Sequence, residues 1–141
     1  MGTRLSLLPL RQAYASLLDA VEAVSVDPEN DLMRDGLIQR FEFTYEMAWK
    51  TMKRYLEAEH YEEATDQWSR RDLYRIAAET GLIGDPQDWF EFMMLRNLSS
   101  HTYNKQTAQK VATAVPDFAS ACERLINVLA KRLDDAAPDT E

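Results

Sequence analysis

Apolar residues recur at steps of three and four through most of this chain, and this spacing constrains the fold more than any other feature. Five stretches show it, and none shows the strict alternation of a half-buried strand. Only four glycines and five prolines interrupt 141 residues, so we expect few turns and long helices. The sequence predicts an all-α, single-domain bundle over residues 1–141, ordered over about 10–134 with a frayed tail at 135–141.

Capping residues set the boundaries of the first three predicted helices. Pro9 suits the first turn of the first helix, which ends before the DPEND stretch. Asp31 is the expected N-cap of the second and longest helix, at about residues 32–59. Ser69 is the expected N-cap of a short third helix, and Gly81 lies where a C′ residue would end it.

The last two predicted helices enclose the polar stretch RNLSSHTY. Asp85 and Pro86 suit the N-cap and the first turn of the fourth helix, which leads into this stretch. The fifth helix is expected over about residues 107–134, with a kink at Pro116 because proline removes an internal hydrogen bond.

Charge and cysteine content restrict the partners and the compartment. Twenty-four acidic and sixteen basic residues give a net charge of −8, which argues against a broad nucleic-acid-binding surface. An RNA-acting protein of this composition needs positive charge in a local site or from dimerisation. The single Cys122 cannot form an internal disulfide, so we expect a buried thiol in a cytoplasmic protein. No apolar run approaches the roughly 20 residues of a membrane span, so we expect no membrane partner.

The chain lacks the residue patterns of a metal or cofactor site. One cysteine and two distant histidines, His60 and His101, cannot form a closed zinc site, and the acidic residues lack the spacing of a calcium loop. The dispersed glycines form no phosphate-binding loop. We therefore expect neither metal nor cofactor, and interpret His60, among glutamates, as a solvated surface residue.

The stretch at residues 96–103 is the candidate site. On an ideal helix Arg96 and Tyr103 would share a face, whereas Arg96 and His101 would diverge by about 140°. Convergence of Arg96 and His101 requires either unwinding around Ser99-Ser100 or a two-fold dimer. The structural alternative is that His101 complements the dipole of a last helical turn while Tyr103 packs against the protein.

The residue types in this stretch suit RNA cleavage without a metal. Such cleavage needs a base for the 2′-hydroxyl proton and an acid for the leaving oxygen, and histidine can perform either task near neutral pH. One chain supplies one such residue, His101, and a two-fold dimer supplies two. Arg96 offers a permanently charged clamp for the phosphate.

The stretch also matches the R-x4-H-x-Y motif of the HEPN superfamily, and it resembles more narrowly the HepT-like proteins, also called nucleotidyltransferase substrate-binding proteins. Two further blocks, GLIQRFEFTYEMAWKTMKRYLE and RDLYRIAAETGLIGDPQDWFEFMMLRN, are similar to the second helix and the third-to-fourth-helix region of that family. The similarity spans most of residues 10–130. It implies an antiparallel bundle of about five helices that dimerises with its two motifs facing each other.

The resemblance also implies a role for each residue of the motif. Arg96 and His101 would be the ribonuclease residues, and Asn97 fills a polar position typical of active members. Tyr103 would accept AMP from a partner nucleotidyltransferase of the MntA type, and this modification would silence the toxin.

Three hypotheses follow from the residues and the resemblance. The first is a homodimeric HepT-like ribonuclease toxin that cleaves RNA without a metal and is neutralised by AMP on Tyr103. The second is a non-catalytic subunit that presents a substrate or nucleotide to a nucleotidyltransferase. The third is a helical interaction module. The intact set of Arg96, Asn97 and His101 favours the first, because scaffolding does not require it.

Overall fold

The computed structural model describes residues 5–59 and 65–136, and every regular element within these ranges is helical. The elements are α1 (Leu8–Val26), α2 (Asp31–Glu59), the 3₁₀ turn η1 (Thr65–Gln67), α3 (Arg70–Glu79), α4 (Pro86–Leu98), the 3₁₀ turn η2 (Ser99–His101) and α5 (Lys105–Ala136). The predicted all-α bundle of five helices is confirmed.

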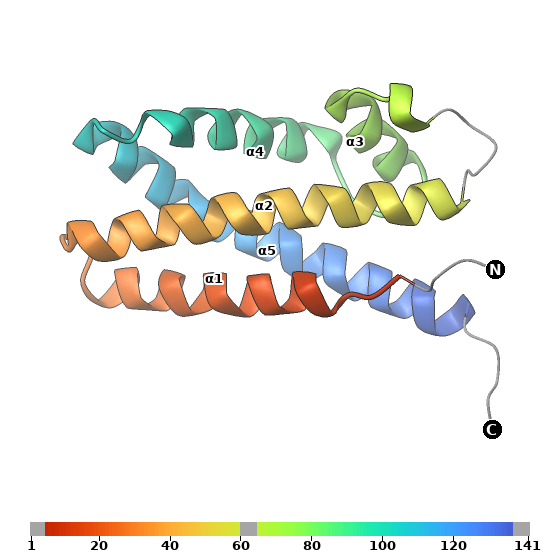
Figure 1. The fold of residues 1–141 in the computed structure, drawn as a ribbon, viewed down its shortest axis with the longest axis horizontal. Helices are drawn as coiled ribbons and strands as arrows, with labels where there is room; N and C mark the ends of the chain where they lie inside the picture. The colour runs from red at the N-terminus through yellow and green to blue at the C-terminus, as the bar shows by residue number, and fades with distance from the viewer. Residues whose placement is uncertain (1–4, 60–64, 137–141) are drawn as a thin grey trace.

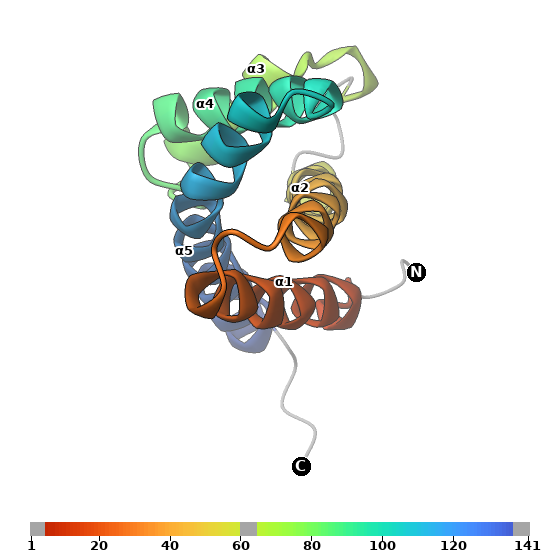
Figure 2. The same ribbon diagram turned by 90° about the vertical axis from the view of Figure 1, so that its left-hand side faces the viewer.

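The helices pack around α2, the element in the middle of the bundle. In Figure 1, α1 runs antiparallel along one side of α2, α4 runs antiparallel along the other, and α5 crosses obliquely behind them. Figure 2 shows α5 connecting the α1 side of the molecule with the α3–α4 side. The α4-to-α5 connection, which carries the candidate site, lies at the same end of the bundle as the α1-to-α2 turn.

An aromatic cluster at the centre of the core holds α4 against α2 and α5. Phe118 of α5 is fully buried, and its ring centroid lies 5.2 Å from that of Phe41 on α2. The same ring lies 5.8 Å from Trp89 and 5.4 Å from Phe92, both on α4, in edge-to-face geometry. Such pairs add about 0.5–1.5 kcal/mol each to the area that they bury. The core therefore fixes the helix that leads into residues 96–103.

Three of the predicted helix ends are confirmed. Ser69 caps α3 in a capping box, in which its side chain and that of Asp72 each accept a backbone N–H from the other residue. Asp85 caps α4 by accepting a hydrogen bond from the backbone of Gln87 at 2.9 Å. Gly81 has a φ of 79°, the left-handed conformation that suits glycine after a helix.

The predicted N-cap of α2 is wrong by one residue. Asn30, rather than Asp31, accepts the backbone N–H of Met33 through its side chain, at 3.0 Å. Asp31 is the first helical residue, and its carboxylate binds the buried Arg34 at 2.6 Å. Both residue types make good caps, so the sequence alone did not distinguish them.

Helix α5 is longer than predicted at both ends. It begins at Lys105, because Asn104 accepts the backbone N–H of Gln106 at 2.8 Å, and it continues to Ala136. It remains helical through Pro116. The rest of the predicted tail, at 137–141, and His60 lie outside the described residues.

The structure also shows where the single cysteine lies and how apolar the helices are. Cys122 is fully buried in the core, as predicted, and burial raises the pKa of its thiol to about 12. Within residues 5–59 and 65–136, none of the helices combines the length and the apolar character needed to cross a bilayer.

Candidate functional site

The candidate site lies where the α-helical geometry of α4 gives way to a tighter turn. Helix α4 ends at Leu98, and Ser99–His101 form the 3₁₀ turn η2 before α5 begins. The helix thus unwinds around Ser99 and Ser100, which is one of the two alternatives by which Arg96 and His101 could converge. Because the helix stops at Leu98, the seven-residue spacing no longer places Tyr103 on the face of Arg96, contrary to the ideal-helix expectation.

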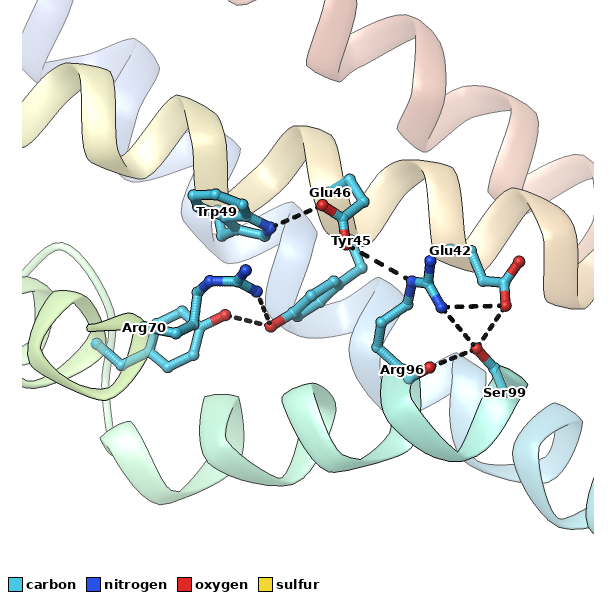
Figure 3. A network of polar contacts seen from close by, with 8 residues as sticks. Glu42, Tyr45, Glu46, Trp49, Arg70, Arg96 and Ser99 are labelled. Carbon is cyan, nitrogen blue, oxygen red and sulfur yellow. Dashed lines mark hydrogen bonds and ion pairs between the residues drawn. The ribbon is translucent and has the colours of Figure 1, made fainter. Parts of the chain in front are cut away.

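Arg96 points toward α2 and contacts two carboxylates there (Figure 3). Its Nη1 lies 3.3 Å from Glu42 Oε2 and 3.3 Å from Ser99 Oγ. Its Nε lies 3.6 Å from Glu46 Oε2, and this buried atom has no hydrogen-bond partner within the described residues. The side chains of Arg96 and the two glutamates are about 30% exposed, so water screens these ion pairs only in part.

Ser99 connects the turn to the same carboxylate. Its side chain is buried, and its Oγ lies 2.5 Å from Glu42 Oε2 and 2.6 Å from the carbonyl oxygen of Arg96. One hydroxyl proton serves one of these two acceptors at a time, while the Oγ accepts from Arg96 Nη1. Ser99, Arg96 and Glu42 thus form a closed triangle between η2, α4 and α2.

Glu46 extends these contacts toward α3. Its Oε1 accepts a hydrogen bond from Trp49 Nε1 at 3.1 Å, and the guanidinium of Arg70 stacks 3.7 Å above the Trp49 ring. Arg70 also donates to the hydroxyl of Tyr45 at 3.0 Å. Polar contacts therefore continue from the motif along α2 to the first residue of α3 (Figure 3).

The far end of this network is a buried pair of tyrosines. The hydroxyls of Tyr45 and Tyr74 lie 2.5 Å apart, and burial raises the pKa of both groups. Both hydroxyls therefore stay protonated near neutral pH. The pair and Arg70 hold α3 against α2.

His101 and Tyr103 lie on the solvent side of the connection. His101 is exposed in η2, and Tyr103 is 89% exposed just beyond it. Their ring centroids are 6.2 Å apart, with the rings edge to face. The alternative in which Tyr103 packs against the protein is therefore wrong. Asn97, in the last turn of α4, is also exposed.

The motif is thus divided between two environments within one protomer. Arg96 lines an open cleft of about 370 Å³, together with Glu42, Glu46 and Lys50 and the apolar side chains of α2. His101 does not line this cleft, and no hydrogen bond joins it to Arg96 among the described residues. Unwinding of the helix alone does not bring the two side chains into contact.

The charges in the cleft balance. Arg96 and Lys50 supply two positive charges, and Glu42 and Glu46 supply two negative ones. Within the described ranges, no group of three histidine, cysteine, aspartate or glutamate side chains is arranged to hold a metal ion. The arrangement offers a guanidinium in fixed orientation, two carboxylates beside it and an exposed imidazole.

Sequence reasoning missed Glu42 and Glu46. They lie four residues apart on α2 and flank the buried positions Phe41 and Tyr45. Charged residues next to buried positions of a helix need either a partner or solvent. The four-residue spacing of the two glutamates beside such positions is the signal that could have identified them. The partner itself, Arg96, lies 54 residues away from Glu42 in the sequence and was not predictable from local pattern.

Comparisons with known proteins agree with this fold. A family model described as "Nucleotidyltransferase substrate binding protein like" matches residues 5–131. The chain is 33% identical to the "Probable ribonuclease HepT" of Haemophilus influenzae, an alignment that covers 94% of this chain and 97% of the relative.

Two solved structures share the fold. One, from Haemophilus influenzae, is described as revealing "the fold of a substrate binding domain of a nucleotidyltransferase"; it superposes with a TM-score of 0.83 at 32% identity, over 89% of this chain and 99% of the other. The second is a crystal structure of a Thermus thermophilus protein, with a TM-score of 0.73 at 29% identity, over 88% of this chain and 98% of the other.

Proposed function

The chain belongs to the family of nucleotidyltransferase substrate-binding proteins, and from this premise we propose that it is a HepT-like ribonuclease toxin. It cleaves RNA without a metal ion, works in the cytoplasm and is controlled by a partner nucleotidyltransferase. The observation that carries the proposal is the complete motif of Arg96, Asn97, His101 and Tyr103, with His101 and Tyr103 exposed where a substrate and a modifying enzyme reach them.

In this proposal Arg96 binds the scissile phosphate and His101 transfers a proton. Arg96 is already fixed by Glu42 and Ser99, so little side-chain entropy is lost when a phosphate binds. The His101 side chain lies apart from Arg96 in one protomer, and the distance is bridged when two protomers associate with their motifs facing each other. Two facing motifs also double the positive charge near the RNA. This local charge favours RNA binding, which the acidic composition of the chain otherwise disfavours.

Tyr103 is the proposed control point. Its exposed hydroxyl accepts AMP from a nucleotidyltransferase of the MntA type, which places a bulky anion next to His101. Co-expression with the partner enzyme should add one or more AMP masses to the chain and stop cleavage. Tyr103→Phe should cleave RNA and escape neutralisation. Peptide mapping that locates AMP on another tyrosine, or on none, refutes this switch.

The second candidate is a non-catalytic subunit that presents a substrate to a nucleotidyltransferase. The observation that favours it is that both carboxylates beside Arg96 already neutralise its charge in the isolated protomer. In this case the motif would be an interaction surface, and RNA cleavage would be absent.

One experiment separates the two candidates. Purified protein is incubated with cellular RNA in the presence of EDTA, beside the variants Arg96→Ala and His101→Ala. A ribonuclease should lose about 10²–10⁴-fold in rate in each variant, because each loses a group that acts in the transition state. Unfolding curves check that the variants fold, and light scattering measures the expected dimer. A wild type that cleaves no RNA refutes the ribonuclease.

A further inference from the structure

The proposed cleavage needs two groups that transfer protons, and the motif supplies one histidine per protomer. The cleft beside Arg96 contains two further ionisable groups that can accept a proton, Glu42 and Glu46. A carboxylate is a suitable general base when it is ionised, partly accessible, held in position and next to the phosphate-binding group. The contacts of the two glutamates distinguish them by this test.

Glu46 has both carboxylate oxygens engaged. Its Oε1 accepts the indole N–H of Trp49, and its Oε2 lies 3.6 Å from Arg96 Nε. These contacts orient Arg96 and leave neither oxygen directed at a substrate. Glu46 is therefore a positioning residue.

Glu42 has one oxygen engaged and one available. Its Oε2 receives both Arg96 Nη1 and the hydroxyl of Ser99, whereas no described residue donates a hydrogen bond to its Oε1. The side chain is 28% exposed and lines the open cleft. Figure 3 shows the second oxygen directed away from Arg96 and Ser99. One oxygen thus fixes the carboxylate, and the other is accessible to a ligand.

We propose that Glu42 is the general base of RNA cleavage, an inference that rests on the proposed ribonuclease function. Glu42 Oε1 takes the proton of the ribose 2′-hydroxyl, and the 2′-oxygen forms a bond to phosphorus. The bond from phosphorus to the 5′-oxygen breaks, and the imidazolium of His101 gives its proton to that oxygen. The products are a 2′,3′-cyclic phosphate and a 5′-hydroxyl, so no further reactant is needed.

The turn η2 directs the Ser99 and His101 side chains of one protomer apart. Ser99, which binds Glu42, and His101 are two residues apart in a 3₁₀ turn, so their side chains diverge by about 120°. His101 therefore points away from Glu42 of its own protomer, and the imidazolium that protonates the 5′-oxygen comes from the second protomer of the proposed dimer. Arg96, hydrogen-bonded to both Glu42 and Ser99, is held beside the base and binds the phosphate oxygens.

The test compares Glu42→Gln with Glu46→Gln and with the control Glu79→Gln on the exposed surface of α3. Glutamine keeps the size of the side chain and can still accept from Ser99, but it cannot take the 2′-hydroxyl proton. We expect Glu42→Gln to lower kcat by about 10²–10⁴-fold, because the general base is lost. KM should not rise, because the substitution also removes a negative charge that repels the phosphate. Glu79→Gln should retain wild-type kinetics.

Two readouts separate a base from a residue that only positions Arg96. The acid-side limb of the profile of kcat/KM against pH should disappear in Glu42→Gln and remain in Glu46→Gln. With uridine 3′-(4-nitrophenyl) phosphate, whose leaving group needs no proton, His101→Ala should regain activity and Glu42→Gln should not.

The outcomes that contradict the proposal are distinguishable. An active wild type with a Glu42→Gln variant that keeps its rate, or keeps the acid-side limb, overturns the assignment of Glu42 and leaves the ribonuclease intact. A higher KM with unchanged kcat makes Glu42 a positioning residue and likewise overturns the assignment. A wild type without cleavage overturns the proposed function and the general base together.

Discussion

The hydrogen bond between Ser99 and Glu42 is the contact that attaches the motif turn to α2, and a double-mutant cycle measures it. Ser99→Ala removes a buried hydroxyl whose oxygen lies 2.5 Å from a carboxylate. Hydrogen bonds to charged groups contribute about 1.5–3 kcal/mol. Because Glu42 is 28% exposed, water partly solvates the carboxylate left behind, and we expect a loss of about 1–2 kcal/mol. This lowers Tm by a few degrees in a chain of this length.

The cycle combines Ser99→Ala with Glu42→Ala in urea unfolding experiments followed by circular dichroism. If the two side chains bind each other, the double variant should be about 1–2 kcal/mol more stable than the sum of the single losses predicts. The matched control pairs Ser99→Ala with Glu79→Ala on α3, where we expect additivity. Additivity to within about 0.3–0.5 kcal/mol for Ser99 and Glu42 would refute the direct contact.

Two further predictions concern the core. Phe118→Ala should lower the free energy of unfolding, measured in urea, by about 3–5 kcal/mol, because this fully buried ring contacts aromatic residues of α2 and α4. A decrease of less than about 1.5 kcal/mol would contradict the role of the aromatic cluster. Burial raises the pKa of the Cys122 thiol to about 12 in the folded protein, whereas the thiol of the unfolded chain has a pKa of about 8.5. The protonated thiol therefore contributes its full stability below about pH 8.5, and this contribution is lost as the pH rises toward 12. The free energy of unfolding should therefore fall more steeply between about pH 8.5 and 12 in the wild type than in Cys122→Ala, and equal slopes would refute it.

The sequence predicted those parts of the fold that local chemistry decides. The capping box at Ser69, the Asp85-Pro86 start of α4 and the left-handed Gly81 depend on residues within one turn of each other, and all three are observed. The cap of α2 was wrong by one residue because Asn30 and Asp31 have nearly equal cap preference. The Asp31 carboxylate binds Arg34, three residues further along the helix, so Asn30 is the residue that accepts the backbone N–H at the cap.

The candidate site was predictable only in part, because its residues come from two helices. The motif is a local feature, and Ser99 and Ser100 within it indicated where the helix could unwind. The carboxylates that bind Arg96 were not predicted, because periodicity shows which face of α2 is buried and does not show which helix covers it. The covering helix is fixed by the aromatic cluster around Phe118, a contact among segments distant in the sequence.

The end of α4 at Leu98 decides which residues of the motif meet the solvent. If the helix continued through residue 103, Tyr103 would point with Arg96 toward α2, and a modifying enzyme would not reach its hydroxyl. The 3₁₀ turn interrupts this alignment, so that Arg96 remains among carboxylates while Tyr103 is 89% exposed. Ser99 holds the turn in this form through a hydroxyl that lies within hydrogen-bond distance of Glu42 and of the carbonyl of Arg96 and donates to one of them at a time. The same hydroxyl therefore keeps in place the arginine that we propose binds the phosphate, and it keeps the tyrosine accessible. One buried side chain thus couples the proposed catalysis and its proposed control.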